Sequence, residues 1–282
     1  MRGLSTSPVP SSLRQRTQTA FLLGPLVLAA VLWLPTPAFA VALGLVTLGA
    51  AWEWARLAGL ERQGQRAGYL ALVGAVLLGL WILPWLRPWL LGAGVMWWLI
   101  QAVHIATVRA IPLRPGLQVG ELAAGVLVLA APWGALVQLH ESDPHGRALV
   151  LFLMMLVWTA DSLAYFVGRR WGRTKLAPLV SPGKTREGVY GALAGALLWG
   201  LLLGWVGSLG PSGTLAAALL CGATVLISVV GDLYESLLKR RSGVKDSSHL
   251  LPGHGGMLDR VDSLTAAAPV FVLGLALMGG LQ

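Results

Sequence analysis

Long apolar runs separated by short polar breaks dominate the chain. A helix needs roughly 20 apolar residues to cross the hydrocarbon core of a bilayer, and nine runs approach that length. They lie near residues 17–34, 38–55, 68–84, 89–107, 117–139, 148–167, 188–208, 213–231 and 263–281. The pattern predicts an all-α, polytopic integral membrane protein with about nine transmembrane helices.

The composition excludes the other broad classes of protein. Hydrophobic residues make up 56% of the 282 positions and charged residues only 12%, whereas an ordinary soluble domain has about 25% charged residues. A soluble fold could not cover its surface with so few charges, and a disordered chain would contain far fewer apolar residues. The single cysteine, Cys221, lies inside an apolar run, so no intrachain disulfide is expected.

The basic residues fall in alternate breaks. With nine spans, 19 of the 21 Lys and Arg residues lie on one side of the membrane, and only Arg87 and Arg147 lie on the other. Cytoplasmic loops carry the excess of basic residues, so the N-terminus is expected in the cytoplasm and the C-terminus outside. The net charge of +9 is then explained by an anionic membrane surface rather than by nucleic acid.

The first 40 residues allow a second interpretation. Arg14 and Arg16, the apolar run and the Ala-Phe-Ala sequence at 38–40 resemble a secretory signal with its cleavage site. The basic segment is long and eight further spans follow, which favours a retained first helix. At the end of the second run, Glu53 and Arg56 are three residues apart and are expected to pair on one helix face.

Polar residues with catalytic chemistry concentrate in the second half of the chain. We therefore divide the sequence into a scaffold of about five spans, residues 1–146, and a catalytic region, residues 147–282. The catalytic region contains two cytoplasmic loops, 169–187 and 239–262, which combine Lys, Arg, Asp, Ser and Gly.

The sixth run and the loop after it supply the first candidates. Asp161 and Tyr165 are four residues apart and share a helix face, and a carboxylate at membrane depth usually faces a cavity or a partner. Ser181, Lys184 and Thr185 suit a phosphate, because they precede a helix whose N-terminus attracts anions. The sequence around Lys184 lacks the upstream glycine and the βαβ context of a nucleotide-binding P-loop, so that interpretation is rejected.

The eighth run ends in a stripe of polar residues. Asp232, Ser236, Lys239 and Arg240 follow the i, i+4, i+7, i+8 spacing of one helix face. This spacing puts the carboxylate about 11 Å from the cations, a distance that suits a metal and a phosphate of one nucleotide. Arg241 is expected to face solvent or head groups. The alternative is a helix end whose charges pair internally.

The following loop contains the densest group of candidates. Asp259 and Asp262 are one helical turn apart at the start of the last run, and paired carboxylates are typical Mg²⁺ ligands. Lys245 and Asp246 precede a glycine-rich stretch whose backbone can approach phosphate oxygens. His254 lies in that stretch and is expected to contact phosphate rather than a metal.

The residues from 236 to 262 resemble the fingerprint of the phosphatidate cytidylyltransferase family, also called CDP-diacylglycerol synthases. The run contains Lys-Arg, Lys-Asp, Leu-Pro-Gly-His-Gly-Gly-Met and Asp-Arg-Val-Asp in order. The segments 161–168 and 181–188 also resemble blocks of this family. Gly183 and Arg186 depart from its usual residues, but neither is a presumed ligand.

The resemblance implies a reaction and a set of roles. The family makes CDP-diacylglycerol and pyrophosphate from CTP and phosphatidic acid with Mg²⁺, and the number of metals is left open, a second cation included. Asp232, Asp246 and Asp259 are then the catalytic candidates. Asp232 and Asp259 are the first choices as metal ligands and Asp262 the second, and Asp246 would orient Lys245 or a metal-bound water.

The resemblance also assigns substrate contacts and a cellular place. It implies a multi-pass protein of the inner membrane, with its site facing the cytoplasm, membrane lipids around it, a homodimeric assembly and no nucleic acid partner. The residues expected to bind CTP or phosphatidate are Ser181, Lys184, Thr185, Ser236, Lys239, Arg240, Lys245, His254 and Arg260, with Asp161 and Tyr165 lining the site.

The same residues also fit two rival functions. One is another lipid enzyme, such as a polyprenol or phytol kinase or a synthase for an archaeal-type lipid. The other is a transporter with Asp161 and Asp232 as ion sites. A transporter predicts acidic residues near the midplane of broken helices, whereas here they cluster toward the cytoplasmic rim, which favours an enzyme.

Overall fold

The computed structural model describes residues 24–279 except 115, 143 and 249–254. Within this part of the chain, eight helices are long and apolar enough to cross a membrane, which confirms the all-α, polytopic class. They are α2 (Thr36–Leu57), α3 (Gln63–Ile82), α4 (Arg87–Thr107, preceded by the 3₁₀ turn Pro84–Leu86), α5 (Val119–Glu141), α6 (Gly146–Trp171), α7 (Arg186–Val206), α8 (Gly210–Arg241) and α9 (Leu258–Leu277).

The first expected span lies partly outside the described residues. Its described part contains the apolar helix Gly24–Trp33, which is shorter than a membrane span. The Ala-Phe-Ala sequence at 38–40 lies inside α2, where Phe39 and Ala40 are buried.

Proline and capping residues set several of the helix starts. Pro35 precedes α2 with an extended backbone, and prolines occupy the first turns of α4 and α8, where the missing N–H costs no hydrogen bond. Thr185 caps α7, because its hydroxyl oxygen accepts a hydrogen bond from the Gly188 amide at 3.2 Å.

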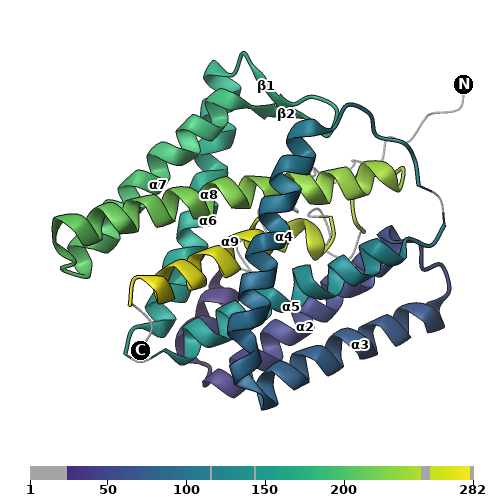
Figure 1. The fold of residues 1–282 in the computed structure, drawn as a ribbon, viewed down its shortest axis with the longest axis horizontal. Helices are drawn as coiled ribbons and strands as arrows, with labels where there is room; N and C mark the ends of the chain where they lie inside the picture. Colours follow the sequence, from purple (N-terminus) through teal and green to yellow (C-terminus); the bar gives the residue numbers. More distant parts are fainter. Residues whose placement is uncertain (1–23, 115, 143, 249–254, 280–282) are drawn as a thin grey trace, which may run out of the picture.

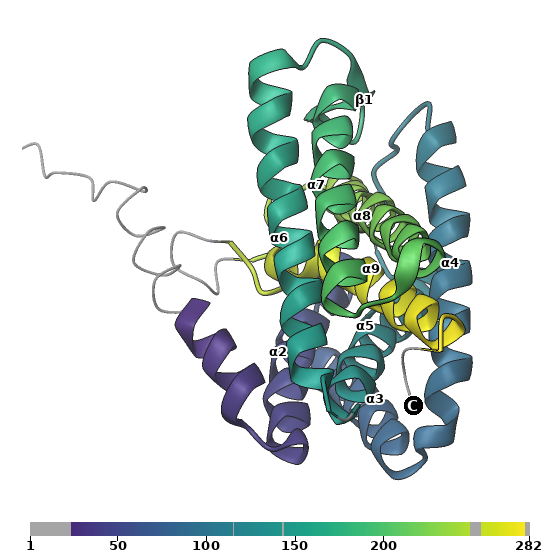
Figure 2. The same ribbon diagram turned by 90° about the vertical axis from the view of Figure 1, so that its left-hand side faces the viewer.

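The helices form two groups joined by α9 (Figures 1 and 2). Helices α2, α3 and α5 pack together on one side, and α6, α7 and α8 pack together on the other. Helix α9 contacts both α5 and α8. Its buried Phe271 and Val272 belong to a core that both groups share, so the two halves of the sequence fold as one body.

A short β-hairpin occupies the loop between α6 and α7. Strand β1 (Lys175–Ala177) pairs antiparallel with β2 (Ser181–Thr185), with Lys175 opposite Thr185. No strand is predicted here from the residues alone, because β2 is only five residues long, contains one Pro and one Gly, and shows no alternating pattern. Helix α6 extends to Trp171, so Arg169 and Arg170 lie on the helix rather than in the expected loop.

Alternate connections gather at the same end of the molecule. At one end the Ser242 hydroxyl donates to the Leu57 carbonyl at 2.8 Å, which joins the segments after α2 and α8. At the other end Arg147 donates to the Leu32 carbonyl at 2.7 Å. The breaks rich in cations and those poor in cations therefore lie at opposite ends, as the alternation requires.

The orientation itself stays a prediction, which reporter fusions test. Fusions after residues 62, 180 and 250 are expected to read as cytoplasmic, because these breaks contain most of the Lys and Arg residues. A fusion after residue 210, at the start of α8, is expected to read as external. A cytoplasmic signal at residue 210 would contradict the topology.

Candidate active site

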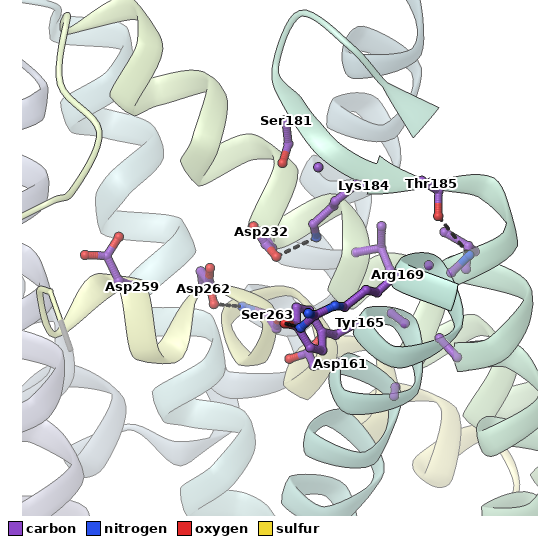
Figure 3. A pocket seen from close by; sticks show the side chains of 18 residues that line it. Asp161, Tyr165, Arg169, Ser181, Lys184, Thr185, Asp232, Asp259, Asp262 and Ser263 are labelled. Carbon is purple, nitrogen blue, oxygen red and sulfur yellow. Dashed lines mark hydrogen bonds and ion pairs between the residues drawn. The ribbon is translucent and has the colours of Figure 1, made fainter. Parts of the chain in front are cut away.

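A cavity of about 600 Å³ opens between α6, α7, α8, α9 and the hairpin. Figure 3 shows the labelled side chains that line it from these elements; most point toward one another, whereas the Asp259 carboxylate points away from the others. Eight of the residues singled out from the sequence line it: Asp161, Tyr165, Ser181, Lys184, Thr185, Asp232, Asp259 and Asp262. The two loops and the two helix ends that carried the sequence motifs thus form one site.

The hairpin brings Lys184 onto the polar stripe of α8. Its Nζ atom lies 2.5 Å from Oδ2 of Asp232, and both side chains are only partly buried, with 26% and 29% of their surface exposed. The pair therefore remains open to the cavity, where an incoming anion can compete for the lysine.

A glycine allows α8 and α9 to approach closely. A Cβ atom on Gly231 would lie 2.7 Å from the Asp262 carbonyl oxygen and 2.9 Å from the Ala266 Cβ, so no larger residue fits there without moving α9. The close contact puts Asp232 and Asp262, from different helices, in the wall of the same cavity.

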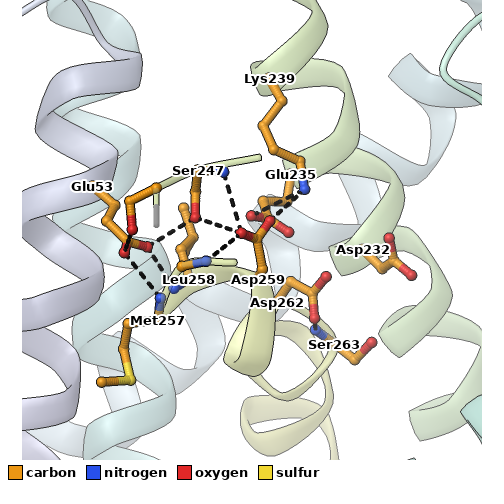
Figure 4. Close-up of polar contacts among 12 residues, drawn as sticks. Glu53, Asp232, Glu235, Lys239, Ser247, Met257, Leu258, Asp259, Asp262 and Ser263 are labelled. Carbon is orange, nitrogen blue, oxygen red and sulfur yellow. Dashed lines mark hydrogen bonds and ion pairs between the residues drawn. The ribbon is translucent and has the colours of Figure 1, made fainter. Parts of the chain in front are cut away.

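Asp259 is held firmly at the start of α9. Its Oδ1 lies 2.6 Å from Lys239 Nζ. Its Oδ2 accepts hydrogen bonds from the Gly256 amide at 2.7 Å and from the Ser247 hydroxyl at 2.8 Å (Figure 4). A carboxylate in the first turn of a helix is also stabilised by the helix dipole. Asp259 is therefore a fixed anionic group at the cavity wall.

Glu235 is an acidic residue that was not predicted from the sequence. It is buried, with 2% of its surface exposed, and its Oε1 lies 3.4 Å from Lys239 Nζ. Lys239 therefore contacts two carboxylates, which makes charge neutralisation its role in this structure. The i, i+4 spacing of Glu235 and Lys239 is the signal that could have revealed the pair.

The remaining candidates lie outside the cavity lining or the described residues. Ser236 is partly buried on α8 but does not line the cavity. His254 falls outside the described residues. The others are exposed and do not line the cavity: Arg240, Lys245, Asp246 and Arg260.

The expectation that Arg241 faces solvent was wrong. Only 11% of its side chain is exposed, and its Nη1 lies 3.1 Å from Oε1 of Glu121 on α5. Tyr234, seven residues earlier on the same face of α8, donates its hydroxyl to Glu121 at 2.6 Å. This face packs against α5, so the inward and outward positions at the end of α8 are set by a neighbouring helix.

Further residues were missed because they lie outside the motifs. Arg169 and Ser263 line the cavity, and Arg169 lies one turn beyond Tyr165, to whose hydroxyl it donates at 2.9 Å. Glu53 contacts the segment before α9, although its helix belongs to the expected scaffold. The described residues show no ion pair between Glu53 and Arg56, contrary to expectation.

The donor set fits a hard cation only together with a substrate. In the described part of the chain, no three acidic, His or Cys side chains form a complete metal site, and lysines neutralise Asp232 and Asp259. Magnesium commonly takes one or two carboxylates and completes its shell with substrate phosphates and water. The carboxylates of this cavity suit that mode of binding.

The fold and the cavity define a polytopic membrane protein with a charged site between its helices. The model of the cytidylyltransferase family matches residues 14–278. The chain is 45% identical to a phosphatidate cytidylyltransferase of Pseudomonas aeruginosa, over 92% of this chain and 95% of the relative. It is 40% identical to one of Haemophilus influenzae, over 92% and 97%.

A relative with lower identity matches a little more than half of the chain. A phosphatidate cytidylyltransferase of Bacillus subtilis is 35% identical over 57% of this chain and 59% of the relative. Because the family model and the first two relatives cover nearly the whole sequence, the chain belongs to the cytidylyltransferase family. It is a nucleotidyltransferase.

Proposed function

We propose that the protein transfers CMP from CTP to phosphatidic acid and forms CDP-diacylglycerol and pyrophosphate with the help of Mg²⁺. The observation that carries this proposal is a charged cavity that adjoins an apolar groove. The names of the relatives from Pseudomonas and Haemophilus support it. The cytoplasmic side of the inner membrane, where CTP is found, is the proposed location.

The apolar groove suits the acyl chains of a lipid. It has a volume of about 500 Å³ and is lined by aliphatic residues of α4, the hairpin, α7 and α8, among them Ile105, Leu176 and Leu226. Val189 and Val229 line both the groove and the charged cavity. A substrate with an anionic head and apolar chains matches this arrangement better than a soluble one does.

The chemistry needs no nucleophile from the protein. A phosphate oxygen of phosphatidate attacks the α-phosphorus of CTP, a new P–O bond forms, and the bond to the departing pyrophosphate breaks. The protein's task is to position both substrates and neutralise their charge. Lys184 and Arg169 supply positive charge at the cavity wall, and the Ser181 hydroxyl supplies a donor.

The acidic residues are the proposed cation ligands. Asp232, Asp259 and Asp262 would hold Mg²⁺. The bound ion would neutralise phosphate oxygens and stabilise the leaving pyrophosphate. A homodimer, which the family resemblance implies, belongs to the same proposal, and light scattering of the purified protein tests it.

The direct test is an assay of the purified protein in detergent with CTP and phosphatidate. Equal amounts of CDP-diacylglycerol and pyrophosphate are expected with Mg²⁺, and none after chelation with EDTA. Phosphorylation of diacylglycerol or a polyprenol, with release of a nucleoside diphosphate, would instead identify a lipid kinase and overturn the proposal.

A substitution in the groove tests the lipid part of the proposal. Ala102→Trp fills space beside Ile105 on α4 and should displace about two methylenes of an acyl chain from the groove. Because each buried methylene contributes about 0.8 kcal/mol, the KM for long-chain phosphatidate is expected to rise about tenfold. The KM for CTP should not change. Val103→Trp is the matched control, since Val103 is exposed and does not line the groove. Equal effects of the two variants would contradict the groove assignment.

A further inference from the structure

Glu53 binds the segment before α9 from a distant helix. Only 1% of its surface is exposed, and both carboxylate oxygens accept hydrogen bonds from that segment (Figure 4). Oε2 accepts from the Leu258 amide at 2.8 Å and the Ser247 hydroxyl at 2.9 Å. Oε1 accepts from the Met257 amide at 2.9 Å and from the Ser248 hydroxyl.

Two of these bonds complete the start of α9. The first amides of a helix have no partner within the helix, and those of Met257 and Leu258 are satisfied by Glu53. A side chain of α2 therefore caps α9, the helix that contributes Asp259 and Asp262 to the cavity. A carboxylate is the favoured group at this end of a helix.

Ser247 connects Glu53 to Asp259. Its hydroxyl oxygen lies 2.9 Å from Glu53 and 2.8 Å from Asp259, and its amide donates to Asp259 at 3.2 Å. A hydroxyl has one proton to donate, so the two carboxylates share it. Ser247 is completely buried, which leaves no water to replace these contacts.

The surroundings allow little adjustment of this connection. A Cβ atom on Gly256 would collide with the Ser247 hydroxyl and the Glu53 carboxylate. One turn after Glu53 on α2, Arg56 donates to the Ser247 carbonyl. Helix α2 thus holds Ser247 at both its side chain and its backbone.

We infer that Glu53 is a positioning residue for the transferase reaction. It holds Ser247 and the first turn of α9, and it thereby fixes the orientation of Asp259 at the wall of the cavity. The inference rests on the proposed function, because it assigns Asp259 to that reaction. Helix α2 then contributes to the active site, although it lies within the expected scaffold, residues 1–146.

The test compares Glu53→Gln, Ser247→Ala and the double variant. Glutamine keeps the shape of Glu53 but turns an amide donor toward groups that also donate. Each single variant is expected to lower kcat about 10- to 100-fold, the range for residues that orient a ligand, with less than about threefold change in the KM for CTP. The double variant should be no slower than the slower single variant, because residues acting through one contact are not additive.

Hydrogen exchange measures the contact between Glu53 and the start of α9 directly and does not depend on turnover. Hydrogen exchange of the Met257 and Leu258 amides is expected to be faster in Glu53→Gln than in the wild type, because Glu53 is their acceptor and the substitution weakens it. Glu141→Gln is the control: Glu141 pairs with buried Arg87 at the opposite end of the molecule. This control should lower thermal stability but leave kcat and the exchange of the Met257 and Leu258 amides unchanged.

Two results would overturn the inference: wild-type kcat in Glu53→Gln, or single-variant losses that multiply in the double variant. A wild-type protein that makes no CDP-diacylglycerol would instead overturn the proposed function. The exchange of the Met257 and Leu258 amides would then still test whether Glu53 holds the start of α9.

Discussion

Asp259→Asn is expected to reduce the rate of CDP-diacylglycerol formation about 1,000-fold, the order seen when one group that stabilises transition-state charge is removed. Asparagine has the same size as aspartate but no charge. Its amide nitrogen would face donors, because Asp259 accepts from Lys239, Ser247 and Gly256. Transfer of label from radioactive CTP into lipid measures the rate.

The control for this variant is Glu61→Gln, which also neutralises a carboxylate. Glu61 is exposed in the turn between α2 and α3, so its loss should leave the rate within about twofold of wild type, as for most surface substitutions. Thermal unfolding should show that Asp259→Asn is folded. A folded variant with near-normal turnover at ordinary Mg²⁺ concentration would contradict the assignment of Asp259 as a metal ligand.

Lys184→Met is expected to lower kcat/KM about 100-fold, since the lysine is a directed positive charge in a site of restricted solvent access. Methionine keeps most of the length of the side chain and removes its ammonium group. The change also leaves Asp232 without the partner that lies 2.5 Å away, and an uncompensated carboxylate repels the phosphates of CTP. Initial rates at varied CTP and phosphatidate measure the loss.

Lys175→Met provides a matched comparison within the same hairpin. Lys175 lies on β1, is exposed and does not line the cavity. Both variants reduce the net charge by one, so a general attraction of CTP to a basic surface would weaken equally in both. A small effect of Lys175→Met beside a large effect of Lys184→Met is the expected result. Equal, small effects would make Lys184 an ordinary basic residue of a cytoplasmic loop.

The membrane spans followed from the sequence because the bilayer imposes a simple rule. Backbone polar groups must be satisfied inside the hydrocarbon region, which requires long apolar helices. The runs near 117–139 and 188–208 therefore predicted α5 and α7 to within a few residues. The hairpin escaped prediction because a paired strand of five residues has no comparable constraint.

The central residues of the site were also visible in the sequence. Local spacing put Asp259 and Asp262 on one side of a helix start, and both line the cavity. The same reasoning failed for Arg241, since helix periodicity tells which residues share a face but not what that face packs against. Glu121 on α5, 120 positions earlier in the chain, decided the orientation of Arg241.

By itself, the sequence determined the class of protein, the helices and most of the charged residues of the cavity, because these depend on apolar length and on spacing within one helix. Only the tertiary structure decided that Lys184 contacts Asp232, and that Glu53 meets Ser247 across 194 positions of sequence. Such contacts depend on which helices pack together and at what rotation. The neighbours of Glu53 in the sequence do not indicate which group its buried carboxylate will bind in the folded protein.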